Sequence, residues 1–162
     1  YLQQGDFEAA KAAADTALKL DAKSLEAKFV RGLVARVARD YGTAEKFLND
    51  AHFQSPGNFD VSNSLALVLI ESEDEEDRRR ALELADTNVA KYRENTPQQV
   101  PAVTSLAWVF YKMGRREDAE RILEQARSSK KFSPTSRCSP RVPTRSICCR
   151  NSRRKPARQP PR

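Results

Sequence analysis

Residues 25–58 read LEAKFVRGLVARVARDYGTAEKFLNDAHFQSPGN, and this stretch decides the fold of the chain. Its pattern predicts two amphipathic helices joined by a tight turn. In the second helix, Leu48 stands between the small residues Ala44 and Ala51. Residues three and four positions apart share one face of a helix, so these three form a stripe that a neighbouring helix can approach closely.

The same pattern returns in the ranges 1–24, 59–99 and 100–133, the first of which holds only part of a unit. The period is 34 residues, except that the range 59–99 is seven residues longer. A large residue at Ala44, or at the matching Ala119, should cost about 1–3 kcal/mol through overpacking. The positions that carry the pattern are Ala10, Ala17, Gly32, Ala44, Leu48, Ala51, Pro56, Leu65, Ala66, Ala81, Ala85, Leu106, Ala107, Gly114, Ala119 and Ala126.

A helix–turn–helix unit of 34 residues with small and large residues in this order resembles the tetratricopeptide repeat. The resemblance covers residues 1–132. It implies an all-α fold, a right-handed α-solenoid of antiparallel helix pairs in which each pair relies on the next for its core. The alternative that the residues leave open is an ordinary helical bundle with alanine-rich seams.

In that family the first helix of each unit lines an inner groove, where a non-catalytic scaffold binds a peptide or protein partner. One family variant clamps a terminal carboxylate there with Lys, Asn and Arg. This chain has mostly apolar residues at the matching places, so the resemblance implies an apolar groove without that clamp. The residues it places on the groove are Phe29, Val30, Leu33, Val37, Asn63, Ser64, Leu67, Glu71, Thr104, Ser105, Trp108 and Lys112.

Trp108 and Phe29 are the large apolar residues of this groove. On a surface that is partly wet, such side chains have the composition of a binding hot spot. Tryptophan is also highly buried on average, so the alternative is that Trp108 packs between helices.

Basic charge is concentrated at the end of the chain. Residues 133–162 hold nine of the 29 Lys and Arg and none of the 22 acidic residues, which leaves a net charge of −2 for residues 1–132. This segment has six Pro and no apolar periodicity, so we expect a disordered tail. Three interpretations compete: an arm that binds nucleic acid or an anionic surface, an out-of-frame translation, and a metal site at the three cysteines Cys138, Cys148 and Cys149.

No residue pattern points to catalysis, a cofactor or a metal in residues 1–132. The single His52 has no nucleophile signature near it, and the acidic run at residues 71–77 lacks the ligand spacing and the glycine of a calcium loop. Acidic residues ahead of a helix instead favour its positive end. Outside residues 25–58, the predicted helices are Phe7–Leu20, Val61–Glu71, Arg78–Tyr92, Ala102–Met113 and Glu117–Ala126.

The ends of the chain and its hydropathy bear on the compartment. There is no long apolar run, which predicts the absence of a membrane span. Tyr1 is not a start residue and the only Met is Met113, so we expect an internal piece of a longer protein, from which any targeting signal upstream would be missing. The cytoplasm is then the default compartment, and the partner's identity is open.

Overall fold

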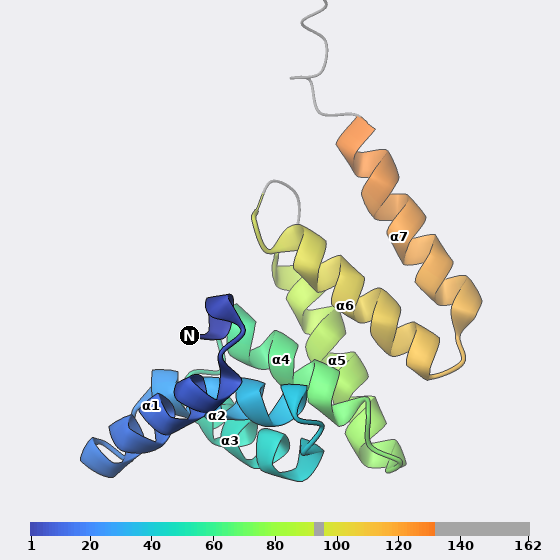
Figure 1. Cartoon of the computed structure of the whole chain (residues 1–162). Helices are drawn as coiled ribbons and strands as arrows, with labels where there is room; N and C mark the ends of the chain where they lie inside the picture. The colour runs from blue at the N-terminus through green and yellow to red at the C-terminus, as the bar shows by residue number, and fades with distance from the viewer. Residues whose placement is uncertain (93–95, 132–162) are drawn as a thin grey trace, which may run out of the picture. The chain divides into compact units, whose positions relative to one another are not determined.

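The computed structural model describes residues 1–92 and 96–131. Within these ranges the chain forms a short 3₁₀ helix and seven α-helices, without a strand, which confirms the predicted all-α class. Figure 1 shows the α-helices following one another from the blue α1 to the orange α7. They are η1 (Leu2–Gln4), α1 (Phe7–Leu20), α2 (Leu25–Val37), α3 (Tyr41–Gln54), α4 (Phe59–Leu69), α5 (Glu75–Lys91), α6 (Gln99–Lys112) and α7 (Arg116–Lys131).

The helices stack in chain order. Helix α2 packs on α3 and α4 packs on α5, and successive pairs meet where α3 contacts α4 and where α5 contacts α6. The first helices of neighbouring pairs also touch, α2 with α4 and α4 with α6. This arrangement places α2, α4 and α6 side by side along the array (Figure 1).

Side-chain caps explain where the first five α-helices begin. Asp6, Ser24, Asp40, Asn58 and Asp74 each accept a hydrogen bond from a backbone N–H in the first turn of the helix that follows. These bonds satisfy donors that have no partner inside the helix. Each cap therefore fixes the first residue of its helix.

Three connections use a left-handed backbone at the same place of the repeat. Gly5 and Gly114 have φ values of 76° and 77°, and the matching residue between α2 and α3 is Arg39, with φ 61°. Glycine adopts this conformation without steric cost, whereas an L-residue with a Cβ pays about 1–2 kcal/mol. The repeat thus keeps the turn at Arg39 even where glycine is missing.

The core lies between successive helix pairs. Its largest fully buried side chains come from the three helices α3, α4 and α6 and from the residue that follows α4: Leu48, Val61, Leu65, Leu69, Ile70, Leu106 and Val109. All sixteen predicted repeat positions are buried except the half-buried Ala17 and Ala126 and the exposed turn residues Pro56 and Gly114. Small residues on the helix faces let these large side chains pack without a gap.

Several predicted helix bounds are corrected. Helix α1 has the predicted bounds. Helix α4 begins at Phe59, two residues before the predicted start, because Asn58 caps it, and it ends at Leu69. Helix α5 begins at Glu75 and not at Arg78, because Asp74 is its cap and three acidic residues occupy its first turn. Helices α6 and α7 are longer than predicted, and Pro101 lies in the first turn of α6, where proline is tolerated.

Residues 1–130 form one compact unit. The predictions made for residues 133–162, a disordered tail, a nucleic-acid-binding arm, a cysteine metal site and an out-of-frame segment, lie outside the described residues.

Candidate partner-binding groove

A hollow of about 500 Å³ opens on the side where α2, α4 and α6 run next to one another. We call it the inner groove. All but one of its side chains come from these first helices and the residues just after α4, and the exception is Tyr41 at the start of α3. The lining residues are Arg36, Val37, Tyr41, Leu67, Glu71, Thr104, Ser105 and Trp108.

Trp108 is held at the edge of this groove by its neighbours on α6. The centroid of its ring lies 5.7 Å from that of Tyr111, and the Lys112 Nζ atom lies 5.9 Å from the Trp108 ring centroid. The same Lys112 Nζ donates a hydrogen bond to Glu71 Oε2 at 2.8 Å, which ties α6 to the end of α4. Trp108 is nevertheless 44% exposed, so it is not a core residue enclosed between helices.

The structure brings some of the predicted groove residues together and separates others. Val37, Leu67, Thr104 and Trp108 line the inner groove, and Lys112 stands at its edge through the pair with Glu71. Glu71 and Ser105, also predicted, line it as well. Leu33 and Asn63 are half-buried and Ser64 is buried on the same helices. The Asn63 Oδ1 atom is buried without a hydrogen-bond partner in the described part of the chain.

Phe29 lies elsewhere on α2. It is partly buried, packs against the core cluster and is not among the residues that line the inner groove. On a helix, each residue is turned by about 100° from the one before, so a face read from sequence can miss by one position. Phe29 contributes to the packing of α2, and its role in partner binding stays a prediction.

Two lining residues were not predicted, Arg36 and Tyr41. Arg36 follows Leu33 by three residues and so shares its face of α2, which is a signal that the sequence contains. Tyr41 opens a second helix, and the resemblance assigns second helices to the outer side. Arg36 makes no ion pair or side-chain hydrogen bond with any other described residue, so its guanidinium is available to a partner.

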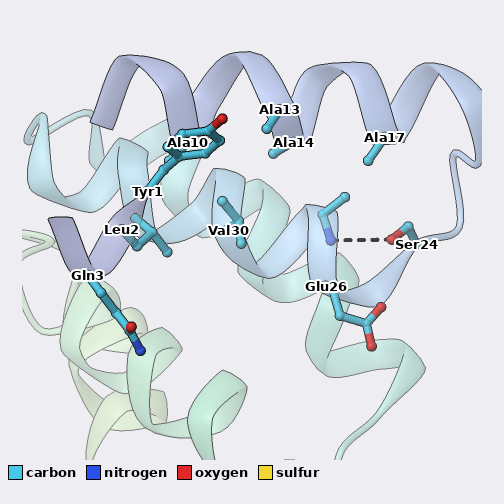
Figure 2. A pocket seen from close by; sticks show the side chains of 11 residues that line it. Tyr1, Leu2, Gln3, Ala10, Ala13, Ala14, Ala17, Ser24, Glu26 and Val30 are labelled. Atoms are coloured by element: carbon cyan, nitrogen blue, oxygen red, sulfur yellow. Dashed lines mark hydrogen bonds between the residues drawn. The ribbon is translucent and has the colours of Figure 1, made fainter. Parts of the chain in front are cut away.

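A second hollow, of about 420 Å³, lies at the N-terminal end between η1, α1 and α2. Figure 2 shows the small side chains Ala10, Ala13, Ala14 and Ala17 along α1, and Tyr1 together with Leu2 and Gln3 of η1 at one end of the hollow. Val30, a predicted groove residue, lines this hollow and not the inner groove. Alanine methyl groups cover most of the α1 side of this hollow, so few polar groups there could form specific hydrogen bonds with a ligand.

His52 lies in a third and smaller hollow, lined also by Leu65, Arg80, Glu83, Leu84 and Thr87. Burial lowers the pKa of His52 below its ordinary value near 6.5, and the positive charge of Arg80 lowers it further. Its Nδ1 atom has no hydrogen-bond partner within the described ranges. His52 is half-buried among these side chains, which is typical of a packing residue at the boundary of the core.

The lowered pKa of His52 predicts a specific pH dependence of stability. Below about pH 6.5 the unfolded chain binds a proton at His52 more readily than the folded chain does, so the free energy of unfolding falls as the pH drops through this window. We expect His52→Gln to reduce this fall between pH 7.5 and 5.5, measured by urea denaturation. Carboxylates titrate alike in both proteins, so equal pH slopes would contradict the assignment.

Acidic residues of the run at 71–77 cap helix α5 and form ion pairs within its first turns. The Asp74 carboxylate accepts a hydrogen bond from the backbone N–H of Glu76, and Asp77 lies 3.8 Å from Arg80. The Arg78 Nε atom donates to the carbonyl oxygen of Ser72 at 2.8 Å. In the two described ranges, no three His, Cys, Asp or Glu side chains are grouped as a metal site would require.

Comparison with known proteins identifies the repeat. A tetratricopeptide repeat family model matches residues 1–59. No curated protein matches the chain.

Solved structures extend the likeness over the other helices. A crystal structure of MamA protein is 19% identical with a TM-score of 0.63, over 81% of this chain and 68% of that one. MamA MSR-1 is 17% identical with a TM-score of 0.61, over 81% of this chain and 71% of that one. MamA AMB-1 is 18% identical with a TM-score of 0.60, over 84% and 70%. At these identities the fold is what is shared, and the prediction of a tetratricopeptide-like solenoid is confirmed.

Tetratricopeptide repeats are, as a family, scaffolds for protein interaction, so the general function predicted from the resemblance is supported. Among the helices of the described ranges, none combines the length and the apolar content of a membrane-spanning segment.

Proposed function

We propose that the inner groove binds a segment of a protein partner. The observation that carries this proposal is the convergence of apolar side chains from three successive repeats on one open hollow. Val37 of α2, Leu67 of α4 and Trp108 of α6 all line it, and Val37 and Trp108 are each about half exposed. Exposed tryptophan at the edge of a hollow is typical of a residue that carries much of the binding energy of an interface.

The polar side chains of the groove define what the partner segment should carry. Arg36 is unpaired within the described residues, whereas Glu71 is already neutralised by Lys112. Thr104 adds a hydroxyl oxygen that can accept a hydrogen bond, because its hydrogen is donated to the carbonyl oxygen of Val100, and the buried Ser105 adds a second hydroxyl group. We therefore expect an extended or helical segment with a large apolar residue against Trp108 and a carboxylate that meets Arg36.

The affinity of such a contact should be moderate. The groove holds only a few side chains, and ordering a peptide offsets part of the gain from burial. A dissociation constant in the micromolar range, or about −8 kcal/mol, is the expected scale.

Replacing Trp108 tests the proposal. Peptides selected from a display library against the full chain should bind the Trp108→Ala variant at least about tenfold more weakly, since a hot-spot aromatic contributes more than about 1.4 kcal/mol. Trp108 is the only tryptophan of the chain, so its fluorescence should also change when a peptide binds the wild type. Calorimetry gives the affinities, and circular dichroism checks that the variant keeps its helices.

A matched control lies on the same helix. Val100 of α6 is 49% exposed but does not line the inner groove, so Val100→Ala should bind the peptides as the wild type does. Peptides that bind Trp108→Ala with unchanged affinity would refute groove binding. Deleting residues 133–162 should also leave the peptide affinity unchanged. The alternative function is nucleic-acid binding through the nine cations of that segment, and it predicts salt-sensitive binding of nucleic acid that the deletion abolishes.

A further inference from the structure

Another hollow, of about 560 Å³, lies between α6 and α7, and no residue of α5 lines it. We call this surface the end face. Buried Ala107 and Ala119 form its floor, and half-exposed Tyr111 and Leu123 stand at its sides. The full lining is Thr104, Ala107, Trp108, Tyr111, Arg116, Ala119, Glu120 and Leu123.

The preceding repeat, α4 and α5, has a helix packed over the surface that corresponds to the end face. Ala66 and Ala81 occupy the repeat positions of Ala107 and Ala119, and both are completely buried in the core between α4, α5 and α6. Helix α6 covers that face by packing on α4 and α5. No described helix covers the end face in the same way, and a repeat buries its apolar side only against a neighbour.

Charges on α7 indicate the nature of the missing neighbour. Arg115 and Arg121, which do not line the end face, each form an ion pair with Asp118. On the end face itself, Arg116 and Glu120 lie one helical turn apart with Ala119 between them, and neither makes an ion pair within the described ranges. The Arg116 guanidinium carbon instead lies 5.8 Å from the centroid of the Tyr111 ring.

A helix with a positive and a negative side chain one turn apart can pair with an identical helix that runs antiparallel to it, because each charge then faces the opposite charge of the other copy. If two α7 helices meet about a two-fold axis near Ala119, Arg116 of each copy faces Glu120 of the other. The small side chain at the axis permits close approach. The Leu123 end of one helix then reaches the Arg116 end of the other, which is where Tyr111 lies. Every large side chain of the hollow except Trp108 gains a partner in this way.

We propose that the end face packs on the end face of a second copy of the chain, which gives a two-fold symmetric dimer. Such an interface is isologous: the same residues contribute from both sides, and each contact occurs twice. Any amphipathic helix could cover the apolar floor, but the self-complementary pair of Arg116 and Glu120 favours a second copy. This proposal goes beyond groove binding and does not depend on it.

The interface should be weak. One hollow between two helices buries less than the roughly 1,200–2,000 Å² of a stable complex. We expect a dissociation constant of the order of 10 μM, so the dimer should appear as the protein concentration rises through this range.

Sedimentation equilibrium of the full chain, under reducing conditions because of the three cysteines in residues 133–162, measures this equilibrium. Leu123, 47% exposed, can be charged without disturbing the core, so Leu123→Glu should stay monomeric where the wild type is dimeric. Phe53 on α3 is 88% exposed and outside the end face, so Phe53→Glu should dimerise as the wild type does. Circular dichroism confirms that both variants are folded.

Charge reversal identifies the partner. Arg116→Glu alone and Glu120→Arg alone each place like charges opposite one another in the dimer, so each should weaken dimerisation by about tenfold. The double variant, with both reversals in one chain, should regain the wild-type constant. A mixture of the two single variants should form heterodimers, because one copy then carries two acidic and the other two basic residues at these places.

Several results would overturn the proposal. They are a wild type that remains monomeric at several hundred micromolar, a dimer that survives Leu123→Glu, and single charge variants that do not associate when mixed. In the first case residues 132–162 or another protein would be the cover of the end face. Trp108 and Thr104 line both hollows, so peptide binding is compared at low micromolar concentration, where the wild type is monomeric. Leu123→Glu should then bind peptides in the inner groove as the wild type does, and a failure of the dimer leaves the groove proposal intact.

Discussion

Leu48→Ala is expected to lower the free energy of unfolding by about 2–5 kcal/mol. Leu48 is completely buried, in a core cluster that includes Ala35 of α2, Leu65 of α4 and Leu106 of α6. Truncating it removes the side chain that fills the space left by the small residues around it. Because each pair depends on the next, the loss should be transmitted to α2 and α4 as well as α3.

The backbone at Gly32 lies very close to the Leu48 side chain, so the two positions compete for the same space. A Cβ atom placed on Gly32 would lie 2.6 Å from Leu48 Cγ and 2.9 Å from Leu48 Cδ2. Gly32→Ala should therefore cost about 1–3 kcal/mol through overpacking, although alanine alone would favour the helix by roughly 0.5–1 kcal/mol. The packing term is the larger of the two.

Combining the two substitutions separates these effects. In the Leu48→Ala background the clash is gone, so the added methyl group at Gly32 should be tolerated or even stabilising. The double variant should then be more stable than the sum of the single variants predicts, with a coupling energy of about 1–3 kcal/mol. Guanidinium denaturation followed by circular dichroism gives the four free energies of unfolding.

Gly42 of α3 supplies the control. Nothing lies within 4 Å of a Cβ built at this position, so Gly42→Ala should leave stability unchanged or raise it. Additive effects of Gly32→Ala and Leu48→Ala would show that the two side chains do not compete for the same space, contrary to the structure.

The order and approximate bounds of the helices could be predicted from the sequence because caps and helix faces are local features of a few neighbouring residues. The stripe of Ala44, Leu48 and Ala51 marks one face of one helix, and the cap Asp40 marks where that helix begins. The start of α5 was predicted three residues late, because the acidic residues Glu75–Asp77 look like a loop. They in fact occupy the first turn, where negative charge stabilises the helix.

The groove was harder to predict because its residues come from three repeats. Which of them meet depends on how far α2, α4 and α6 are rotated and shifted against one another, and a single sequence holds no direct signal of this. Phe29 and Arg36 show the consequence, since both lie on α2 and only Arg36 lines the inner groove. The resemblance to a repeat family predicts which side of a helix lines the groove, whereas the packing of the helices determines which residues on that side do so.

Ala44→Leu and Ala119→Leu should differ, although the two alanines occupy the same place in their repeats. Ala44 is completely buried in the core cluster, so a leucine there forces α3 away from its neighbours and should cost about 1–3 kcal/mol or more. Ala119 is 7% exposed and borders the open hollow of the end face, so its added atoms can extend into that hollow. We expect Ala119→Leu to cost less than about 1 kcal/mol, which revises the equal costs predicted from the sequence.

The comparison should be made by chemical denaturation at low micromolar concentration, where association through the end face does not contribute. Equal losses of stability would mean that Ala119 is enclosed as tightly as Ala44, and hence that the end face is already covered within the chain. A small loss at Ala119 together with weaker self-association at high concentration would instead place the new side chain between the two copies. The repeat position alone does not determine the cost of filling it, because that cost depends on whether a following helix is present to be displaced.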